Sequence, residues 1–332
     1  MNATTAISVP GRTAARALKA LGITGGRPAA AIEYVTASTR WSDATRIERA
    51  LDVMGTGNQP GLAGGAIAAD YMDAVRPATI VGRLPLLRQI PLYTRMVTGT
   101  GTTAYWINEA DPKTPTTASY ANGGSLKPYK VAALAVVTQE LVKASEVDTL
   151  LTRDLNASLV EAVDLAFISP SNAGVVGERP ASVTNAATAI PATNDPAVDI
   201  AALIDAFAGK LETAAFVMNP RIAARLNLRG RAFETIHALG GSLVGIPVVT
   251  SSAVPFDSAG SPIALLDQDG IEISGLDDAT LRTSEQAIVF TAEGDTATSL
   301  WQSDLIGYLA ETPVAWRART GSVAVINGAS YG

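Results

Sequence analysis

The segment that decides the fold runs from Lys127 to Pro170 and reads KPYKVAALAVVTQELVKASEVDTLLTRDLNASLVEAVDLAFISP. Its first part, Tyr129 to Val137, is an apolar run rich in valine and alanine that predicts a β-strand. Its second part, Ser145 to Phe167, contains neither glycine nor proline and predicts one long helix. An arm that feeds directly into a long helix suits a subunit that clasps its neighbours better than a compact monomeric enzyme.

The long helix has clear end signals. Ser145 is the expected N-cap, and Asp148 follows three residues later as in a capping box. At ~1.5 Å per residue the helix would be ~35 Å long, and Pro170 lies just beyond its end. We expect Arg153, Asn156, Glu161 and Asp164 on its polar side. The apolar positions recur with the helical period: Val147, Leu150, Leu151, Leu155, Leu159, Ala162, Val163 and Ala166.

A long hairpin is predicted before this helix. Thr102 to Ile107 predicts one strand, Asn108 to Ser125 is a polar connection, and Pro128 to Val137 returns as the second strand. Its arms would reach roughly 30–50 Å at ~3.3 Å per residue. Tyr105 and Trp106 are candidate interface anchors, because aromatic residues concentrate binding energy. Packing within the base of the hairpin is the alternative role for them.

Elements of mixed type flank this segment. Met1 to Gly64 is expected to be an arm with short helices at Arg12 to Leu21 and Ser42 to Met54. A helix from Ala66 to Val75 and an irregular strand from Ile80 to Val97 follow it. Asp195 to Asp295 is expected to be a separate α/β unit, opened by an Asp195 cap with Pro196 at the first helical position. Strands are expected after it and before it, which predicts a discontinuous domain. The other expected elements are strands at Ala214 to Met218, Gly245 to Thr250, Ile263 to Asp267, Gly270 to Ile273, Leu305 to Leu309, Val314 to Ala318 and Ser322 to Ile326, and a helix from Asn219-Pro220 to Leu228.

The composition excludes several classes of function. Hydrophobic residues make up 47% and charged residues 17% of the 332 residues, which favours large buried subunit interfaces or else an alanine-rich protein from a high-GC genome. The formal net charge is −6 and no basic stripe is visible, which argues against sequence-specific nucleic-acid binding. Cysteine is absent, which excludes disulfides and thiolate chemistry. We expect neither a membrane span nor a signal peptide.

Residues for catalysis are also sparse. His237 is the sole histidine, and the nearby Ser242 lacks the glycine pattern of a nucleophile elbow. The glycines of Gly99 to Ala104 precede a strand, whereas a dinucleotide fingerprint opens a helix. The spacing of Asp267, Asp269, Asp277 and Asp278 does not match a calcium loop. We therefore expect no enzyme activity, no cofactor and no metal.

The order of elements resembles the major capsid proteins of tailed double-stranded DNA phages, the Hong Kong 97-type family. The resemblance spans roughly Gly64 to Gly328. Its weak individual motifs occur in the family's order: Gly64 to Ile67 through Arg76 to Val81 for the entry into the peripheral domain, Thr103 to Val137 for the E-loop, Gln139 to Phe167 for the spine helix, Phe216 to Arg221 and Leu243 to Val249 for the axial domain, and Leu300 to Asp304 through Pro313 to Trp316 for the return strands.

The resemblance implies an α+β capsid fold with a peripheral domain that carries the spine helix, an axial α/β domain, an extended E-loop hairpin and an N-terminal arm. The implied boundaries are 1–64 for the arm, 65–101 for the first part of the peripheral domain, 102–137 for the E-loop, 138–194 for the peripheral domain with the spine helix, 195–295 for the axial domain and 296–332 for the return strands.

The implied function is that of a structural subunit that self-assembles into hexamers and pentamers of an icosahedral shell around double-stranded DNA, bound without sequence specificity. Implied partners are other copies, a portal and a separate scaffolding protein, with no membrane. The chain would be made in the cytoplasm of a bacterial host and reside in the virion capsid. An encapsulin-like compartment that encloses a cargo enzyme is the alternative, and a soluble hydrolase is a remote one.

The resemblance also raises covalent cross-linking, in which an E-loop lysine joins a neighbour's asparagine with help from a glutamate. Lys113, Lys127 and Lys130 lie in or beside the hairpin, and Glu311 and Asn327 lie near the C-terminus. The three lysines are more economically interpreted as ordinary solvated side chains. They are assembly-interface candidates in either case.

Overall fold

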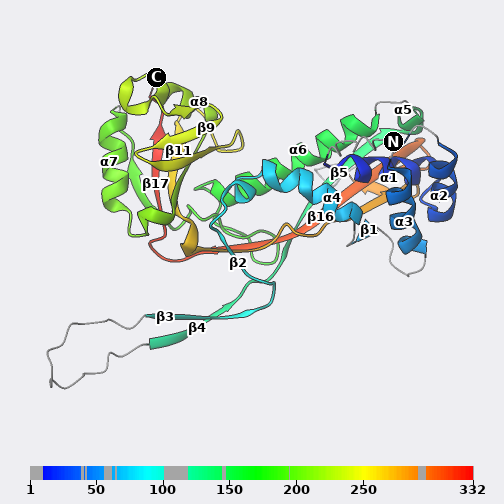
Figure 1. Cartoon of the computed structure of the whole chain (residues 1–332), viewed down its shortest axis with the longest axis horizontal. Coiled ribbons are helices and arrows are strands. Elements are labelled where there is room, and N and C mark those ends of the chain that lie inside the picture. Colours follow the sequence, from blue (N-terminus) through cyan, green and yellow to red (C-terminus); the bar gives the residue numbers. More distant parts are fainter. Residues whose placement is uncertain are drawn as a thin grey trace, which may run out of the picture.

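The computed structural model describes residues 10–38, 41, 43–55, 62–63, 66–100, 119–143, 147–193, 195–290 and 297–331. Figure 1 shows an elongated body with two lobes and a hairpin that leaves it from the middle. The N-terminal helices lie at one end of the body, and the C-terminus lies in the lobe at the other end. The mixed α+β class is as expected from the sequence.

The helix α6 (Val147–Ile168) links the two lobes along one side of the body (Figure 1). Residues four apart form its buried stripe, because they share one face of a helix: Leu151, Leu155, Leu159, Val163 and Phe167. Phe167 meets Trp316 edge to face, with ring centroids 5.4 Å apart. The predicted helix is confirmed. Ser145 lies outside the described residues, and Asp164 lies in the core instead of on the polar side.

The first sheet has the order β1 (Leu62–Ala63), β13 (Thr280–Ser284), β16 (Leu305–Ala318), β12 (Ile271–Gly275) and β2 (Arg88–Gln89). The strand β16 has a further antiparallel neighbour, β5 (Tyr129–Thr138). The pairing runs from Leu305 opposite Thr138 to Val314 opposite Tyr129. The prediction that this strand returns along the hairpin is therefore wrong. The reason is that Val131, Ala133, Ala135 and Val137 form an apolar face that packs into the core beneath the helices.

The projecting hairpin consists of β3 (Arg95–Thr100) and β4 (Ser119–Ser125), with Arg95 opposite Ser125 and Thr100 opposite Ser119. These strands leave the body in Figure 1. The hairpin thus begins earlier than 102, and the predicted strand Thr102 to Ile107 lies outside the described residues. The expected irregular strand from Ile80 to Val97 is strand only at β2 and from Arg95 onward in β3, and its first part forms the short turn η2 (Val81–Arg83). Another short turn, η1 (Arg76–Ala78), precedes it.

The second sheet has the order β6 (Thr188–Pro191), β17 (Val323–Ala329), β11 (Ser261–Asp267), β7 (Ala214–Met218), β10 (Ile246–Thr250), β9 (Gly240–Leu243) and β8 (Ile236–His237). The helices α7 (Pro196–Ala206) and α8 (Pro220–Asn227) belong to this lobe. Asp195 caps α7 as predicted, accepting the N–H of Ala197 at 2.9 Å. Asn219 caps α8, accepting the N–H of Arg221 at 2.9 Å.

Three strands join a different sheet from the one that the expected segments 195–295 and 296–332 assign to them. β12 and β13 fall within 195–295 but pair in the first sheet. β17 falls within 296–332 but lies between β11 and β6 in the second sheet. Its run Val323 to Ile326 is buried on both faces, which requires an interior position in a sheet.

The N-terminal region also departs from the expected arm. Within 10–55 the chain forms α1 (Arg12–Ile23), α2 (Pro28–Ala37) and α3 (Ala44–Gly55). The alanines of α1 allow close packing against the core, and the Asp70 carboxylate of α4 (Ala66–Val75) accepts the N–H groups of Thr13 and Ala14 at 3.1 and 3.2 Å. These helices are part of the first lobe's core. The remaining elements are α5 (Gln139–Lys143), η3 (Leu211–Thr213), η4 (Arg231–Phe233), η5 (Gln268–Gly270), β14 (Ile288–Phe290) and β15 (Ala297–Ser299).

Candidate assembly surfaces

The sequence-predicted interface residues divide into two groups. Tyr105, Trp106 and Lys113 lie in 101–118, outside the described residues. Lys127 and Lys130 are exposed at the foot of the hairpin, and Lys130 lies opposite Pro313 of β16. Neither lysine has an ion pair with another described residue. Both are therefore accessible to a partner.

The two residues suggested for cross-link chemistry lie on different sheets. Glu311 is half-buried on β16 of the first sheet, and Asn327 is exposed on β17 of the second. The cross-link stays a prediction.

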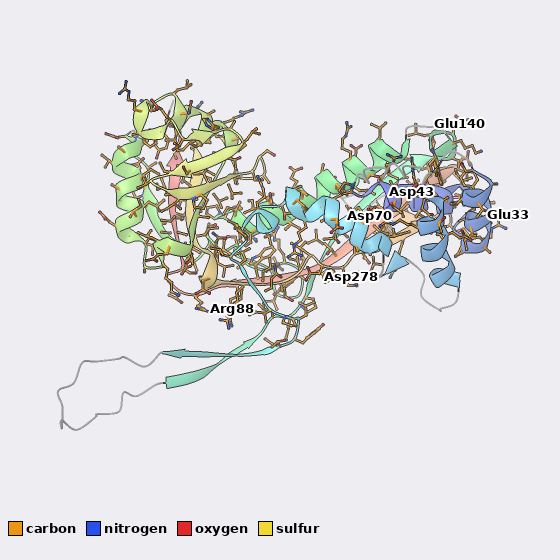
Figure 2. All side chains as sticks on the ribbon, viewed as in Figure 1. Glu33, Asp43, Asp70, Arg88, Glu140 and Asp278 are labelled. Atoms are coloured by element: carbon orange, nitrogen blue, oxygen red, sulfur yellow. The ribbon has the colours of Figure 1, made fainter. Side chains whose placement is uncertain are left out.

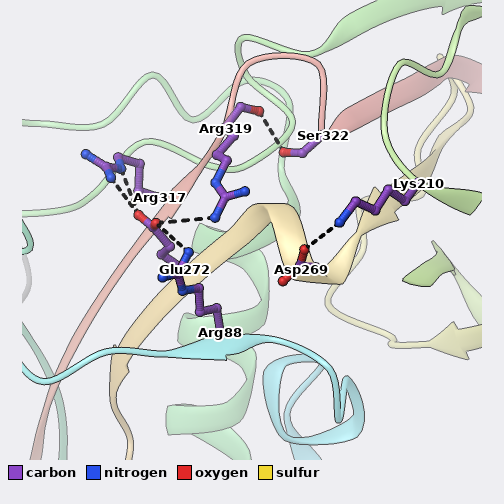
Figure 3. A network of polar contacts seen from close by, with 7 residues as sticks. All are labelled: Arg88, Lys210, Asp269, Glu272, Arg317, Arg319 and Ser322. Atoms are coloured by element: carbon purple, nitrogen blue, oxygen red, sulfur yellow. Dashed lines mark hydrogen bonds and ion pairs between the residues drawn. The ribbon is translucent and has the colours of Figure 1, made fainter. Parts of the chain in front are cut away.

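A cluster of charges lies at the junction of the lobes, and sequence reasoning missed it. The buried carboxylate of Glu272 on β12 accepts hydrogen bonds from Arg317 on β16, at 2.6 Å from Nη2 and 3.2 Å from Nε. Arg88 and Arg319 each approach its other oxygen to 3.9 Å, which is too far for a hydrogen bond. Figure 3 shows all three guanidinium groups around one carboxylate. In the sequence, only the closely spaced arginines Arg317 and Arg319 pointed to this cluster of charges.

A neutral pair lies beside this cluster. Lys210 Nζ is 3.0 Å from Asp269 Oδ2 (Figure 3). The hydrogen bond and charge of Lys210 lower the pKa of Asp269, and the more distant charges of Arg319 and Arg88 lower it slightly further. The cluster as a whole therefore has a surplus of positive charge.

A buried carboxylate joins three segments near the end of α6. Asp164 accepts the N–H of Ile80 and the hydroxyl of Ser251, both at 2.7 Å. Burial raises its pKa to about 6, against the lowering effect of those hydrogen bonds and of the Arg83 charge. Ser251 follows β10 of the second sheet, and Ile80 precedes η2. Asp164 therefore ties the long helix to both lobes.

An apolar groove of about 730 Å³ opens on the first lobe, between the α1–α2 turn and strands β13, β14 and β16. Leu134, Ile288 and Phe290 line it, with 52%, 61% and 63% of their surface exposed. Trp301 is 74% exposed next to the lining residue Leu300. Exposed apolar side chains gathered in this way are typical of protein–protein contact surfaces.

No group of three or more His, Asp or Glu side chains among the described residues could hold a metal ion. His237 is exposed at the end of β8. Among the helices that the structure describes, none is long and apolar enough to cross a bilayer.

Comparisons with known proteins identify the family of the chain. The model of the "Phage capsid family" matches residues 79–303. A capsid polyprotein of Pseudomonas phage PAJU2 is 33% identical over 296 residues, which are 80% of this chain and 44% of that protein. The chain thus spans less than half the length of this curated relative.

Solved structures share the fold. A protein of Gordonia phage Cozz superposes with a TM-score of 0.53 at 18% identity, over 74% of this chain and 85% of that one. A protein of Mycobacterium phage Ogopogo gives 0.52 at 19% identity, over 76% and 92%. The Hong Kong 97-type fold is confirmed, and the matches favour a structural protein over an enzyme. The family match covers more than half of the sequence, and the chain belongs to the phage capsid family.

Proposed function

We propose that this chain is a shell subunit that assembles with copies of itself into the hexamers and pentamers of an icosahedral phage capsid. The observation that carries the proposal is the β3–β4 hairpin. It leaves the body with no sheet partner among the described residues beyond its own two strands. A two-stranded ribbon is marginally stable alone in water, so a neighbouring subunit is the natural support for it.

The body has the surfaces that such a shell requires. Its groove exposes Leu134, Ile288 and Phe290, and burial of apolar area drives association. In this proposal the first sheet with α6 is the peripheral domain, the second sheet is the axial domain, and the β3–β4 hairpin is the E-loop. The shell would enclose double-stranded DNA without reading its sequence, with a portal and a separate scaffolding protein as further partners. Synthesis would take place in the bacterial cytoplasm.

The test is expression of the chain alone and together with its neighbouring phage genes, followed by negative-stain electron microscopy and size-exclusion chromatography. Rings or closed shells are expected. A variant chain is tested beside the wild type, in which a short Gly-Ser linker replaces residues 96–124. Its urea midpoint reports whether the body remains folded. We expect this variant to stay folded and to form no shells. A wild-type chain that stays monomeric in both settings would contradict the proposal.

The aromatic anchors are tested in the same assay. Trp106→Ala is expected to reduce shell yield without changing the urea midpoint, because anchor residues contribute binding energy out of proportion to their number. An unchanged yield would remove Trp106 from the set of interface residues.

A further inference from the structure

A hollow of about 520 Å³ lies between the foot of the hairpin, the segment 180–187 and the turn after β16. Three cationic side chains line it: Lys127, Arg317 and Arg319. None of the described residues that line it carries a carboxylate. The volume falls within the ~300–1,000 Å³ typical of binding pockets.

The positive charge at this hollow is only partly neutralised. Arg317 forms two hydrogen bonds to Glu272. Arg319 and Arg88 stay 3.9 Å from the same carboxylate, and Lys127 has no ion pair among the described residues. Three arginines therefore share the Glu272 carboxylate (Figure 3), and Lys127 adds a further positive charge to the lining of the hollow. Separated like charges of this kind are stabilised when an external anion binds between them.

The chemistry of the lining selects the anion. The planar guanidinium group matches carboxylates and phosphates in two-point hydrogen bonds. The other lining residues include Leu126, Tyr129, Val183 and Trp316, which favour a ligand with an apolar portion. Binding to DNA phosphates instead requires rows of cations on an open surface, and a hollow of this size admits side chains but no duplex. A carboxylate carried by a protein segment fits best.

We propose that this hollow receives a carboxylate-bearing segment of a second copy of the chain. The sequence has 31 acidic and 25 basic residues, so each copy presents carboxylates in excess. Glu33 on α2 and Glu140 on α5 are exposed at the far end of the body from the second lobe (Figure 2). A head-to-tail contact joins two such different patches on neighbouring subunits. The inference deepens the shell function proposed above and rests on it.

A matched pair of charge reversals tests the contact. Lys127→Glu places a carboxylate at the hollow, whereas Arg231→Glu reverses a charge at an exposed position of the second lobe that does not line it. Assembly is followed with purified protein in the absence of DNA. We expect Lys127→Glu to raise the protein concentration needed for assembly about tenfold, equivalent to ~1.4 kcal/mol of contact energy, and Arg231→Glu to leave it unchanged. Urea midpoints of both variants should match the wild type. Equal effects of the two reversals would overturn the inference.

A photo-cross-linker identifies the occupant. Replacement of Tyr129 by benzoylphenylalanine puts a reactive group in the hollow, and mass spectrometry of irradiated shells locates the cross-link. A cross-link to an acid-bearing segment of another copy supports the inference. Shells that form with no intersubunit cross-link, or with a cross-link to a segment without acidic residues, overturn the inference alone. Failure of the wild-type chain to form any shell overturns both the inference and the proposed function.

Discussion

Substitution of Asp164 by asparagine should remove a pH dependence that is built into the junction of the lobes. The folded-state pKa of Asp164 is about 6, above the ordinary aspartate value of 3.8. The folded chain therefore binds the proton more tightly than the unfolded chain. Stability from this group is fully present below pH ~4 and is lost as the pH rises through 6.

The magnitude follows from the difference between the two pKa values. At ~1.36 kcal/mol per pH unit, the rise from 3.8 to about 6 corresponds to about 3 kcal/mol in full. About 2.4 kcal/mol of this loss in the free energy of unfolding falls between pH 4 and pH 7. The side chain of the asparagine variant is neutral throughout this range. Its amide oxygen can still accept the N–H of Ile80, and its amide group can donate to Ser251.

The assay is urea unfolding of the unassembled subunit, followed by circular dichroism at pH 4, 5, 6 and 7. Relative to Asp164→Asn, the wild type should lose about 2.4 kcal/mol over this range. Asp154→Asn, at an exposed position of the same helix, controls for the introduction of asparagine and should run parallel to the wild type. A constant difference between wild type and Asp164→Asn at all four pH values would refute the reasoning.

Further predictions concern packing and the charged cluster. A Cβ at Gly22 would lie 2.1 Å from the Tyr308 hydroxyl oxygen, so Gly22→Ala should destabilise by ~1–3 kcal/mol. The hydroxyl has no hydrogen-bond partner among the described residues, so Tyr308→Phe alone should leave the free energy of unfolding unchanged. In the double variant it should reduce the loss of stability caused by Gly22→Ala. Strictly additive effects of the two substitutions would contradict this. Glu272→Ala should destabilise by ~3–5 kcal/mol, because it leaves several arginines facing one another, and a loss below ~1 kcal/mol would mean that solvent screens them. Phe167→Ala should lower the free energy of unfolding by ~3–5 kcal/mol, while Leu165→Ala on the exposed side of the helix should change it little. Urea unfolding measures each value.

Short-range patterns predicted much of the chain's secondary structure. The helix from Ala66 to Val75 has the bounds predicted for it, and the caps Asp195 and Asn219 make the expected hydrogen bonds. Caps and helical periods depend on residues within a few positions of one another, so they can be read directly from the sequence. The resemblance to phage capsid proteins rested on the order of these elements, and the family match confirmed it.

Such local patterns could not predict which strands pair with each other. The run Tyr129 to Val137 was a strand, as predicted, but its partner was β16 instead of the other arm of the hairpin. The same residues could pair in either way, since alternation states which face is apolar and not which strand lies alongside. β12 and β17 likewise pair with strands distant in sequence, so local patterns could not predict which sheet each of them joins.

The assembly residues were predicted only in part. Lys127 was a candidate because it lies beside the hairpin, but its neighbours Arg317 and Arg319 come from the far end of the sequence. Asp164 was expected on a polar helix face, and the structure buries it against Ile80 and Ser251. Periodicity and capping thus determine which segments are helices and strands and which family they indicate. Tertiary packing decides which charges meet and which are buried, because those contacts join residues that no local pattern connects.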